Sequence, residues 1–426
     1  MHPLKEKTLK RHAIVSYCSA NDIVLEAAME DAAMRGCHIL IEATANQVNQ
    51  FGGYTGMQPK DFISFIQELA IKIGLDKELL ILGGDHLGPL TWQTEPQALA
   101  MNNAEELVAA YVEAGFTKIH LDTSMRLADD PPDKPLSVHT IASRGAILAK
   151  SAINAWEKRR TVHPESQELV FIIGSEVPIP GGAKDSEDRI FITSHEDFAG
   201  TVSTYCKVFE AEGLKQIWDN IIGVVVQPGV EFSDNTVLQY DRTAASGLVQ
   251  SLTDYPGLVF EGHSTDYQTL NSLTNMVQDG VCILKVGPEL TFNLRKGLLS
   301  LALLEEELVA VHERSNFRYI LDKVMCCEPG YWEEYYRGSV EENKQARMYS
   351  LSDRCRYYLG NRLVKETIEK MFANIDMTSI PPGMVHQYLS LVFEELLTSK
   401  KLTARELIKR YLRNGVIWKY QTAISR

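Results

Sequence analysis

Residues 79–89, LLILGGDHLGP, end an apolar run with an acid and a histidine side by side, Asp85 and His86. Carboxylate and imidazole groups bind divalent metals, and a carboxylate can also act as a general acid or base. The pair therefore suggests either a metal-binding catalytic centre or the remains of one. Choosing between them depends on which other residues the fold brings to the same place.

Short apolar runs alternate with longer amphipathic stretches over about the first 290 residues. This βαβ rhythm, with runs rich in Ile, Val and Leu, is typical of parallel strands covered by helices. We predict an α/β fold, a (β/α)8 TIM barrel, because eight such runs are the number that closes a barrel. The alternative, an open doubly wound sheet, has less support, because no dinucleotide-binding or P-loop glycine motif follows any of the runs. The runs are 13–19, 38–44, 79–86, 118–124, 169–177, 221–229, 257–264 and 281–288. GGYTG (52–56) is interpreted as a plain turn.

The pattern changes after residue 288. Residues 289–313 read as one long helix, the eighth of the barrel, and the sequence beyond it is amphipathic, rich in aromatic residues and without a clear strand. We expect a barrel over residues 1–312 and an α-helical C-terminal extension over 313–426. The aromatic clusters of the extension are interpreted as packing between helices.

The chemistry of a barrel lies at the C-terminal ends of its strands. Burying many ionisable groups there is costly unless they pair or bind an ion, so these strand ends form a candidate site. The residues that close the runs are Cys18, Ser19, Glu42, Thr44, Asp85, His86, Asp122, Ser124, Ser175, Glu176, Gln227, Glu261, His263, Ser264 and Lys285.

Some of these residues have a structural interpretation as well. The alternative to a functional site is a network of ion pairs made by Glu42, Glu176, Glu261 and Lys285. Asp122 could instead cap the segment that follows it. Lys118 and His120 lie within the strand body, so we expect them to face the outer helices and assign them no role.

A divalent metal such as Zn²⁺ would need ligands from separate strand ends. His86 and His263 are the histidines found there, and Glu261 is the third candidate ligand. Two histidines with a carboxylate are an acceptable zinc set, although weaker than three histidines.

Composition excludes several other classes of protein. The net charge of -13, from 43 basic and 56 acidic residues, disfavours nonspecific binding to nucleic acid or anionic lipid. We expect no membrane insertion, because no apolar stretch is long enough for a membrane helix, and a cytoplasmic location, because the N-terminus lacks the apolar core of a signal peptide. The seven cysteines have no zinc-site spacing and are interpreted as free thiols.

Longer motifs carry a family resemblance over essentially the whole chain. The sequence resembles the GatZ/KbaZ family, the non-catalytic subunit of class II D-tagatose-1,6-bisphosphate aldolase. The motifs are IEATANQVNQFGGYTGM (41–57), LGGDHLGP (82–89), AGFTKIHLD (114–122), SEVPIPGG (175–182), VVVQPGVEF (224–232), EGHSTDYQT (261–269), KVGPELTF (285–292), YSLSDRCRYY (349–358) and IPPGMVHQYL (380–389).

The barrel is more distantly similar to the catalytic class II aldolases, and this resemblance implies a degraded site. Asp85 and His86 match the family's proton-transferring acid and first zinc ligand. Gln227 stands where a second zinc histidine is expected, Glu261 stands where the third is expected, and Gly287 replaces a substrate-binding asparagine. A carboxamide binds zinc more weakly than an imidazole, so the Lewis-acid step should be lost.

The resemblance therefore implies a subunit that supports the activity and stability of a catalytic aldolase subunit, its expected partner. The pathway would be tagatose 6-phosphate metabolism in galactitol or N-acetylgalactosamine breakdown. Asp85 and His86 would be vestigial, and a sugar phosphate could still bind, with its phosphate near the loops after the last two strands. The candidate ligand-binding residues are Glu42, Asp122, Glu176, Gln227, Ser264, Lys285 and Gly287.

Two other functions stay open. An independent metal-dependent lyase would use His86, Glu261 and His263 as metal ligands and Asp85 as acid or base. A tagatose 6-phosphate kinase is the weaker hypothesis, because neither a P-loop nor a kinase-type glycine-rich loop is present.

Overall fold

Eight parallel strands close into a barrel in the computed structural model, which describes residues 1–177, 191–398 and 402–425. Their order around the barrel is β1-β2-β3-β4-β5-β6-β9-β10, with β10 pairing β1. Each of the eight barrel strands falls on one of the predicted runs, with β3 extending one residue beyond its run, so the closed (β/α)8 prediction is confirmed. The bounds are β1 Ile14–Tyr17, β2 Ile39–Thr44, β3 Leu80–Leu87, β4 Lys118–Leu121, β5 Val170–Ile173, β6 Ile221–Val226, β9 Val259–Gly262 and β10 Val281–Val286.

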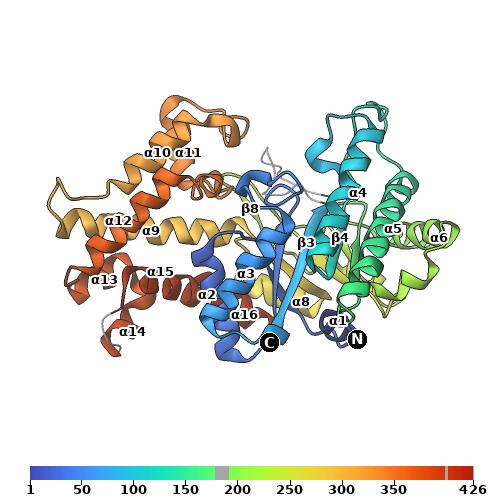
Figure 1. The fold of residues 1–426 in the computed structure, drawn as a ribbon, viewed down its shortest axis with the longest axis horizontal. Coiled ribbons are helices and arrows are strands. Elements are labelled where there is room, and N and C mark those ends of the chain that lie inside the picture. Colours follow the sequence, from blue (N-terminus) through green and yellow to red (C-terminus); the bar gives the residue numbers. More distant parts are fainter. Residues whose placement is uncertain (178–190, 399–401, 426) are drawn as a thin grey trace.

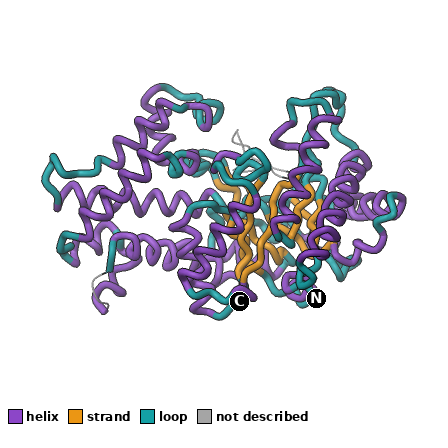
Figure 2. Tube along the Cα trace, viewed as in Figure 1, coloured by secondary structure: helices purple, strands orange, loops and turns teal. Residues whose placement is uncertain are grey.

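A helix follows each strand and covers the outside of the barrel (Figure 2). Their ends carry the expected signals: the Asn21 side chain accepts the first free N–H groups of α2, and Gly36 ends that helix in the left-handed conformation. The bounds are α2 Asp22–Arg35, α3 Pro59–Ile73, α4 Gln97–Ala114, α5 Val138–Val162, α6 His195–Ala211, α7 Ser246–Ser251, α8 Leu270–Gln278 and α9 Pro288–Leu308.

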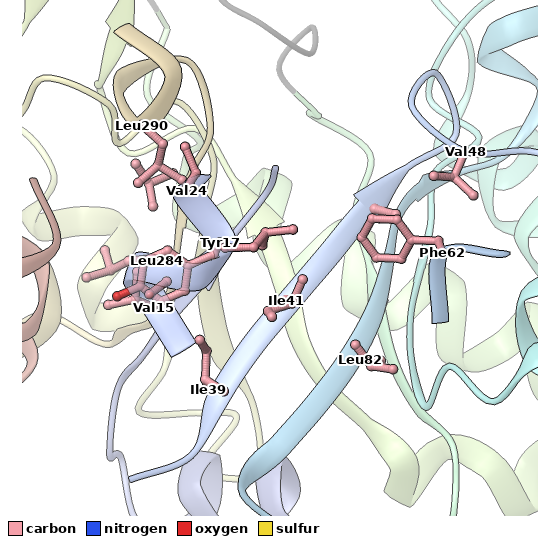
Figure 3. Close-up of a cluster of buried hydrophobic side chains, with 14 of the residues drawn as sticks. Val15, Tyr17, Val24, Ile39, Ile41, Val48, Phe62, Leu82, Leu284 and Leu290 are labelled. Atoms are coloured by element: carbon pink, nitrogen blue, oxygen red, sulfur yellow. The ribbon is translucent and has the colours of Figure 1, made fainter. Parts of the chain in front are cut away.

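Alternate residues of each strand face opposite sides of the barrel wall. Outward-facing Val15, Tyr17 and Ile41 pack in the large core between strands and helices (Figure 3). Inside the barrel, a smaller apolar cluster fills the N-terminal half of the strands. Its members are Leu4, Ile14, Leu40, Ile81, Val170, Ile172, Ile222, Val225 and Ile283. The polar side chains of the interior lie towards the C-terminal ends of the strands.

A short helix, α1 (Pro3–Leu9), closes the N-terminal end of the barrel. Its Leu4 is fully buried in the inner cluster. His2 precedes it as the cap: its Nδ1 accepts the Leu4 N–H at 3.1 Å, and its Nε2 lies 2.9 Å from Thr117 Oγ1. Burial, followed by the nearby N-terminal charge, lowers the pKa of His2 from 6.5 to about 4.

Acid should weaken the fold through His2. Between pH 6.5 and about 4, His2 binds a proton in the unfolded chain but stays neutral in the folded chain. Stability is therefore full above pH 6.5 and is lost as pH falls towards 4, by about 3 kcal/mol at most at 1.4 kcal/mol per pKa unit. His2→Asn keeps the cap acceptor without the titration, so its urea unfolding free energy should fall less between pH 7.5 and 4.5. Equal losses in both proteins would contradict this assignment.

Beyond α9, every regular element in the described part of the chain is helical, as predicted. Helices α10 to α13 project away from the barrel, whereas the last helices return to it (Figure 1). Helix α15 contacts α2 and α9, and α16 contacts α8 and β1. The bounds are α10 Phe317–Cys327, α11 Val340–Tyr349, α12 Arg362–Asp376, α13 Pro382–Tyr388, α14 Phe393–Thr398, α15 Ala404–Leu412 and α16 Trp418–Ile424.

Smaller features complete the fold. GGYTG forms a 3-10 turn, Gly53–Thr55, between two left-handed glycines. A small hairpin, β7 (Glu231–Phe232) with β8 (Val237–Leu238), follows β6 and was not predicted. All seven cysteines are free. None of the described helices combines the length and apolar character needed to cross a membrane.

Candidate functional site

A bulge explains how Asp85 and His86 both face the barrel mouth. In a regular strand, neighbouring side chains point to opposite faces. Between β3 and β4 the register shifts from Gly84 opposite Ile119 to Leu87 opposite Leu121, so two β3 residues stand against the single residue His120. His86 has a φ of 47°, which is rare for a residue with a side chain. The distortion turns both functional groups into the same space.

The floor of the mouth is a buried ion-pair network. Lys118 Nζ lies 2.7 Å from a carboxylate oxygen of Glu42 and 2.7 Å from one of Glu261, and all three side chains are fully buried. Lys285 Nζ lies 2.8 Å from Asp85 Oδ1 and 3.2 Å from Glu42 Oε1. Our expectation that Lys118 faces the outer helices was wrong. Lys118 points inward because it is the strand neighbour of Ile119, which faces outward.

Glu42 is held from two further sides. The Ser16 hydroxyl donates to its Oε1 at 2.6 Å. Gly83 leaves space for the carboxylate, since a Cβ there would lie 2.9 Å from Glu42 Oε2. The predicted ion pairs thus form among Glu42, Glu261 and Lys285. The prediction was wrong for Glu176, which is exposed and accepts a hydrogen bond from the Thr193 hydroxyl.

Three histidine rings gather above this network. The ring centroids of His86, His120 and His263 lie 4.9 to 5.2 Å apart. His263 Nε2 is 3.0 Å from Glu261 Oε1, and His120 Nδ1 is 2.8 Å from Asp85 Oδ1. The outward orientation expected for His120 was therefore also wrong. Its position two residues after Lys118 places it on the same inward face.

Asp122 both contacts a histidine of the mouth and caps the segment that follows it. Its Oδ2 lies 2.7 Å from His86 Nδ1, and its Oδ1 accepts hydrogen bonds from the backbone N–H and hydroxyl of Ser124. Burial would raise the pKa of Asp122, but the contact with His86 outweighs it and lowers the value to about 2. Asp122 therefore stays ionised and fixes the orientation of the His86 ring.

The histidines have opposite protonation preferences. Burial opposes the charged form of His86, but the carboxylates of Asp85 and Asp122 outweigh it and raise its pKa. For His263, burial dominates and lowers the pKa to about 3, so its imidazole is neutral. The pKa of Asp85 is well below its usual range because His86 and Lys285 overcome the effect of burial. The mouth thus holds ionised acids beside one neutral and one readily protonated imidazole.

A group of potential metal ligands lies at the centre of the mouth. One donor atom from each of Asp85, His120, Glu261 and His263 falls within 4.8 Å of the others. This group contains Glu261 and His263 of the predicted zinc set, with Asp85 and His120 in place of His86. A buried cluster of acids and histidines able to hold a metal is therefore present.

Comparison with known proteins identifies the family. The family model described as D-tagatose-1,6-bisphosphate aldolase subunit GatZ/KbaZ-like matches residues 2–425. This chain belongs to the GatZ/KbaZ-like family. It is similar to D-tagatose-1,6-bisphosphate aldolase subunit GatZ of Salmonella heidelberg (strain SL476), with 43% identity over 92% of this chain and 91% of that protein. The GatZ subunit of Salmonella newport (strain SL254) is 42% identical over the same shares.

A solved structure matches the GatZ/KbaZ-like chain along almost its full length. It is described as a probable tagatose 6 phosphate kinase from Sinorhizobium meliloti 1021. The TM-score is 0.86 at 38% identity, covering 96% of this chain and all of that one. The barrel and the helical extension together are therefore shared by both proteins.

Two predicted residues of the GatZ/KbaZ-like site lie outside the cluster. The Gln227 carboxamide oxygen accepts the backbone N–H groups of Gly229 and Val230, at 2.9 and 3.1 Å. Thr193 donates through its hydroxyl to Glu176 and through its backbone N–H to the Gln227 carbonyl. Ser175 is likewise engaged, with its hydroxyl 2.6 Å from that of Thr201. The rest of the SEVPIPGG motif, from residue 178, lies outside the described residues.

The loops after the last two strands are occupied by an internal acid. Asp266 Oδ1 accepts the backbone N–H groups of Gly287 and Glu289, at 3.0 and 2.8 Å. These are N–H groups of the kind that cradle a phosphate at this place in barrels. Ser264, in the left-handed conformation, and Gly287 line the adjoining cavity, together with Lys285. Glu42, Asp122, Glu176 and Gln227 do not line it.

Sequence reasoning missed Lys118, His120 and Ser16. For Lys118 and His120 the signal was a polar residue at every second position of an otherwise apolar strand. Ser16 shares the inward face of its strand with Ile14, two residues earlier. It also assigned no role to Arg356 and Tyr357 of the extension, which line the same cavity as the strand ends.

Proposed function

We propose that this chain is the supporting, non-catalytic subunit of a D-tagatose-1,6-bisphosphate aldolase. It would bind the catalytic subunit and maintain its activity and stability, in the breakdown of galactitol or N-acetylgalactosamine. Family membership supports the aldolase assignment. The observation that favours a non-catalytic role is Gln227: its carboxamide oxygen is used within its own loop, at the position where the resemblance to catalytic aldolases requires a zinc ligand.

The donors in the mouth nevertheless fit a divalent cation. The buried carboxylates of Glu42, Asp85, Asp122 and Glu261 face two lysine ammonium groups, which leaves negative charge for a cation or protonated histidines to balance. His120 Nε2 is buried without a hydrogen-bond partner in the described part of the chain. Asp85, His120, Glu261 and His263 would hold the ion, which would supply Lewis-acid polarisation of a bound carbonyl group. Lys118 and Lys285 compete with it for the same carboxylates.

The test is a cleavage assay with D-tagatose 1,6-bisphosphate. We would compare this chain, a catalytic aldolase subunit and their mixture, with added zinc and with bound metal measured in each sample. We expect no turnover by this chain alone, and a higher rate or a longer active lifetime for the catalytic subunit in the mixture. A Gln227→Ala chain should support the partner as well as the wild type does.

Two results would overturn the proposal. Sustained cleavage by this chain alone, with stoichiometric metal, would establish the independent lyase and make Glu261 and His263 working ligands. ATP-dependent phosphorylation of D-tagatose 6-phosphate would instead support the description given to the Sinorhizobium protein. The kinase has less support here, because the sequence has no P-loop or kinase-type glycine-rich loop.

A further inference from the structure

A cavity of about 820 Å³ lies between the barrel mouth and the C-terminal extension. Asp85, His86 and His263 line it from the strand ends, and Tyr331, Arg356 and Tyr357 line it from the extension. This volume falls within the range of roughly 300–1,000 Å³ typical of small-molecule sites. The extension is therefore part of the wall of the mouth.

Arg356 presents an unpaired cation to this cavity. Its Nη1 donates to the Ser352 and Asp353 carbonyl oxygens, and its Nη2 donates to the Tyr357 hydroxyl at 3.1 Å. Glu328 and Glu369 also line the cavity, yet no carboxylate of the described residues lies within ion-pair distance of Arg356. Its hydrogen-bond partners are all neutral, and the nearby Asp353 carboxylate is already paired with Arg295, so this half-buried guanidinium retains its attraction for an anion.

The surroundings of Arg356 reinforce its positive charge. Arg354 and Arg356 both lie against the Tyr357 ring, 4.6 and 4.7 Å from its centroid. Arg354 is buried, and its Nη1 has no hydrogen-bond partner among the described residues. Burial would raise the pKa of Tyr357, but Arg356 and Arg354 outweigh it and lower the pKa. Tyr331 and Tyr54 pack on the same ring at 4.8 and 4.6 Å, which holds this group in place.

The end of the cavity at the barrel strands is acidic, whereas the end at the extension is basic. Asp85, Asp266 and the neutral imidazole of His263 provide hydrogen-bond acceptors suited to hydroxyl groups. Lys285 is the cation at this end, and it is already paired with Asp85 and Glu42. Asp266 already takes the Gly287 and Glu289 N–H groups, so its carboxylate stands where a barrel would otherwise hold a phosphate. An anionic group is thus disfavoured at the strand ends and favoured at the extension.

We propose that this cavity binds a sugar monophosphate, with the phosphate on Arg356 and the hydroxyl groups towards the acids and imidazoles of the strand ends. The ligand-binding cation then comes from the extension and not from the loops after the last strands. The inference rests on the proposed function only for the choice of sugar.

Calorimetric titration of the full chain with D-tagatose 6-phosphate tests this site. We expect Arg356→Met to weaken binding about ten-fold or more, the usual loss for a charge-assisted hydrogen bond. Unphosphorylated D-tagatose should bind the wild type more weakly and should be insensitive to Arg356→Met. Inorganic phosphate should bind more weakly than the sugar phosphate. The matched control is Arg362→Met, which removes a charge from a side chain that is 91% exposed, and its affinity should equal that of the wild type.

Three outcomes would overturn the proposal: no binding of D-tagatose 6-phosphate to the wild type, equal affinity in Arg356→Met, or equal affinity for inorganic phosphate. If Arg356→Met fails to fold, Arg356→Lys decides, because it keeps the charge but loses the planar fork and should bind several-fold more weakly. Unchanged affinity in that variant would also overturn the proposal. Binding by the isolated chain is independent of the partner, so failure to stimulate an aldolase would leave this result standing.

Discussion

Replacing Lys118 with methionine should lower the free energy of unfolding by about 3–5 kcal/mol. The methionine fills most of the same space, but it leaves the carboxylates of Glu42 and Glu261 without the cation that lies 2.7 Å from each. Both carboxylates are fully buried, so water cannot replace the lysine. Urea unfolding at pH 7.5 measures the loss directly.

A surface pair provides the matched control for Lys118. Lys150 Nζ lies 2.6 Å from Glu212, a similar distance, but both side chains are about half exposed. Lys150→Met should therefore cost less than about 1 kcal/mol. Adding Glu42→Gln to Lys118→Met removes one of the two buried charges that lose Lys118 as a partner and should recover part of the loss. Similar costs for Lys118→Met and Lys150→Met would show that the network contributes little to stability.

Replacing Gly88 with alanine should destabilise the fold by about 3 kcal/mol, at the upper end of overpacking effects. A Cβ at this position would lie 1.6 Å from the Asp122 carbonyl oxygen. The obstacle is backbone, which cannot move aside as a flexible side chain can, so the ends of β3 and β4 must separate. His86 and Asp122, whose side chains meet at 2.7 Å, would be displaced with them.

Gly330→Ala is the control for this substitution. Nothing lies within 4 Å of the Cβ that it would add, so its unfolding free energy should stay within about 0.5 kcal/mol of the wild type. Thermal and urea unfolding of both variants check the difference. A Gly88→Ala protein as stable as Gly330→Ala would mean that β3 and β4 separate at little cost.

The barrel could be predicted because buried parallel strands leave continuous apolar runs. The same continuity hid which way individual residues point. The strand that contains Lys118 and His120 is only four residues long. We expected these two side chains to face the outer helices, whereas they face the barrel interior. The alternation between them and the buried Ile119 was the available signal, because period two fixes the face of every residue once one is known.

The membership of the site was harder to predict, because strand ends diverge into loops. Asp85 and His86 reach the centre together through a bulge and a left-handed residue, which no propensity of either residue indicates. Glu176 and Gln227 close their runs in the same manner but turn to Thr193 and to their own backbone. The contribution of Arg356 depends on how a separate helical segment folds over the mouth, and local sequence carries no record of that contact.

The return of α15 and α16 to the barrel bears on how the protein is made. Gln421 donates to the Tyr17 hydroxyl across 404 residues of sequence, and Arg405 pairs with Asp22 and Glu26. Because a ribosome releases the N-terminal part first, α2 and β1 must wait for partners that are synthesised much later. The outer wall beside β1 is thus completed only after α15 and α16 have been synthesised, and a chain interrupted within α16 would leave that wall open.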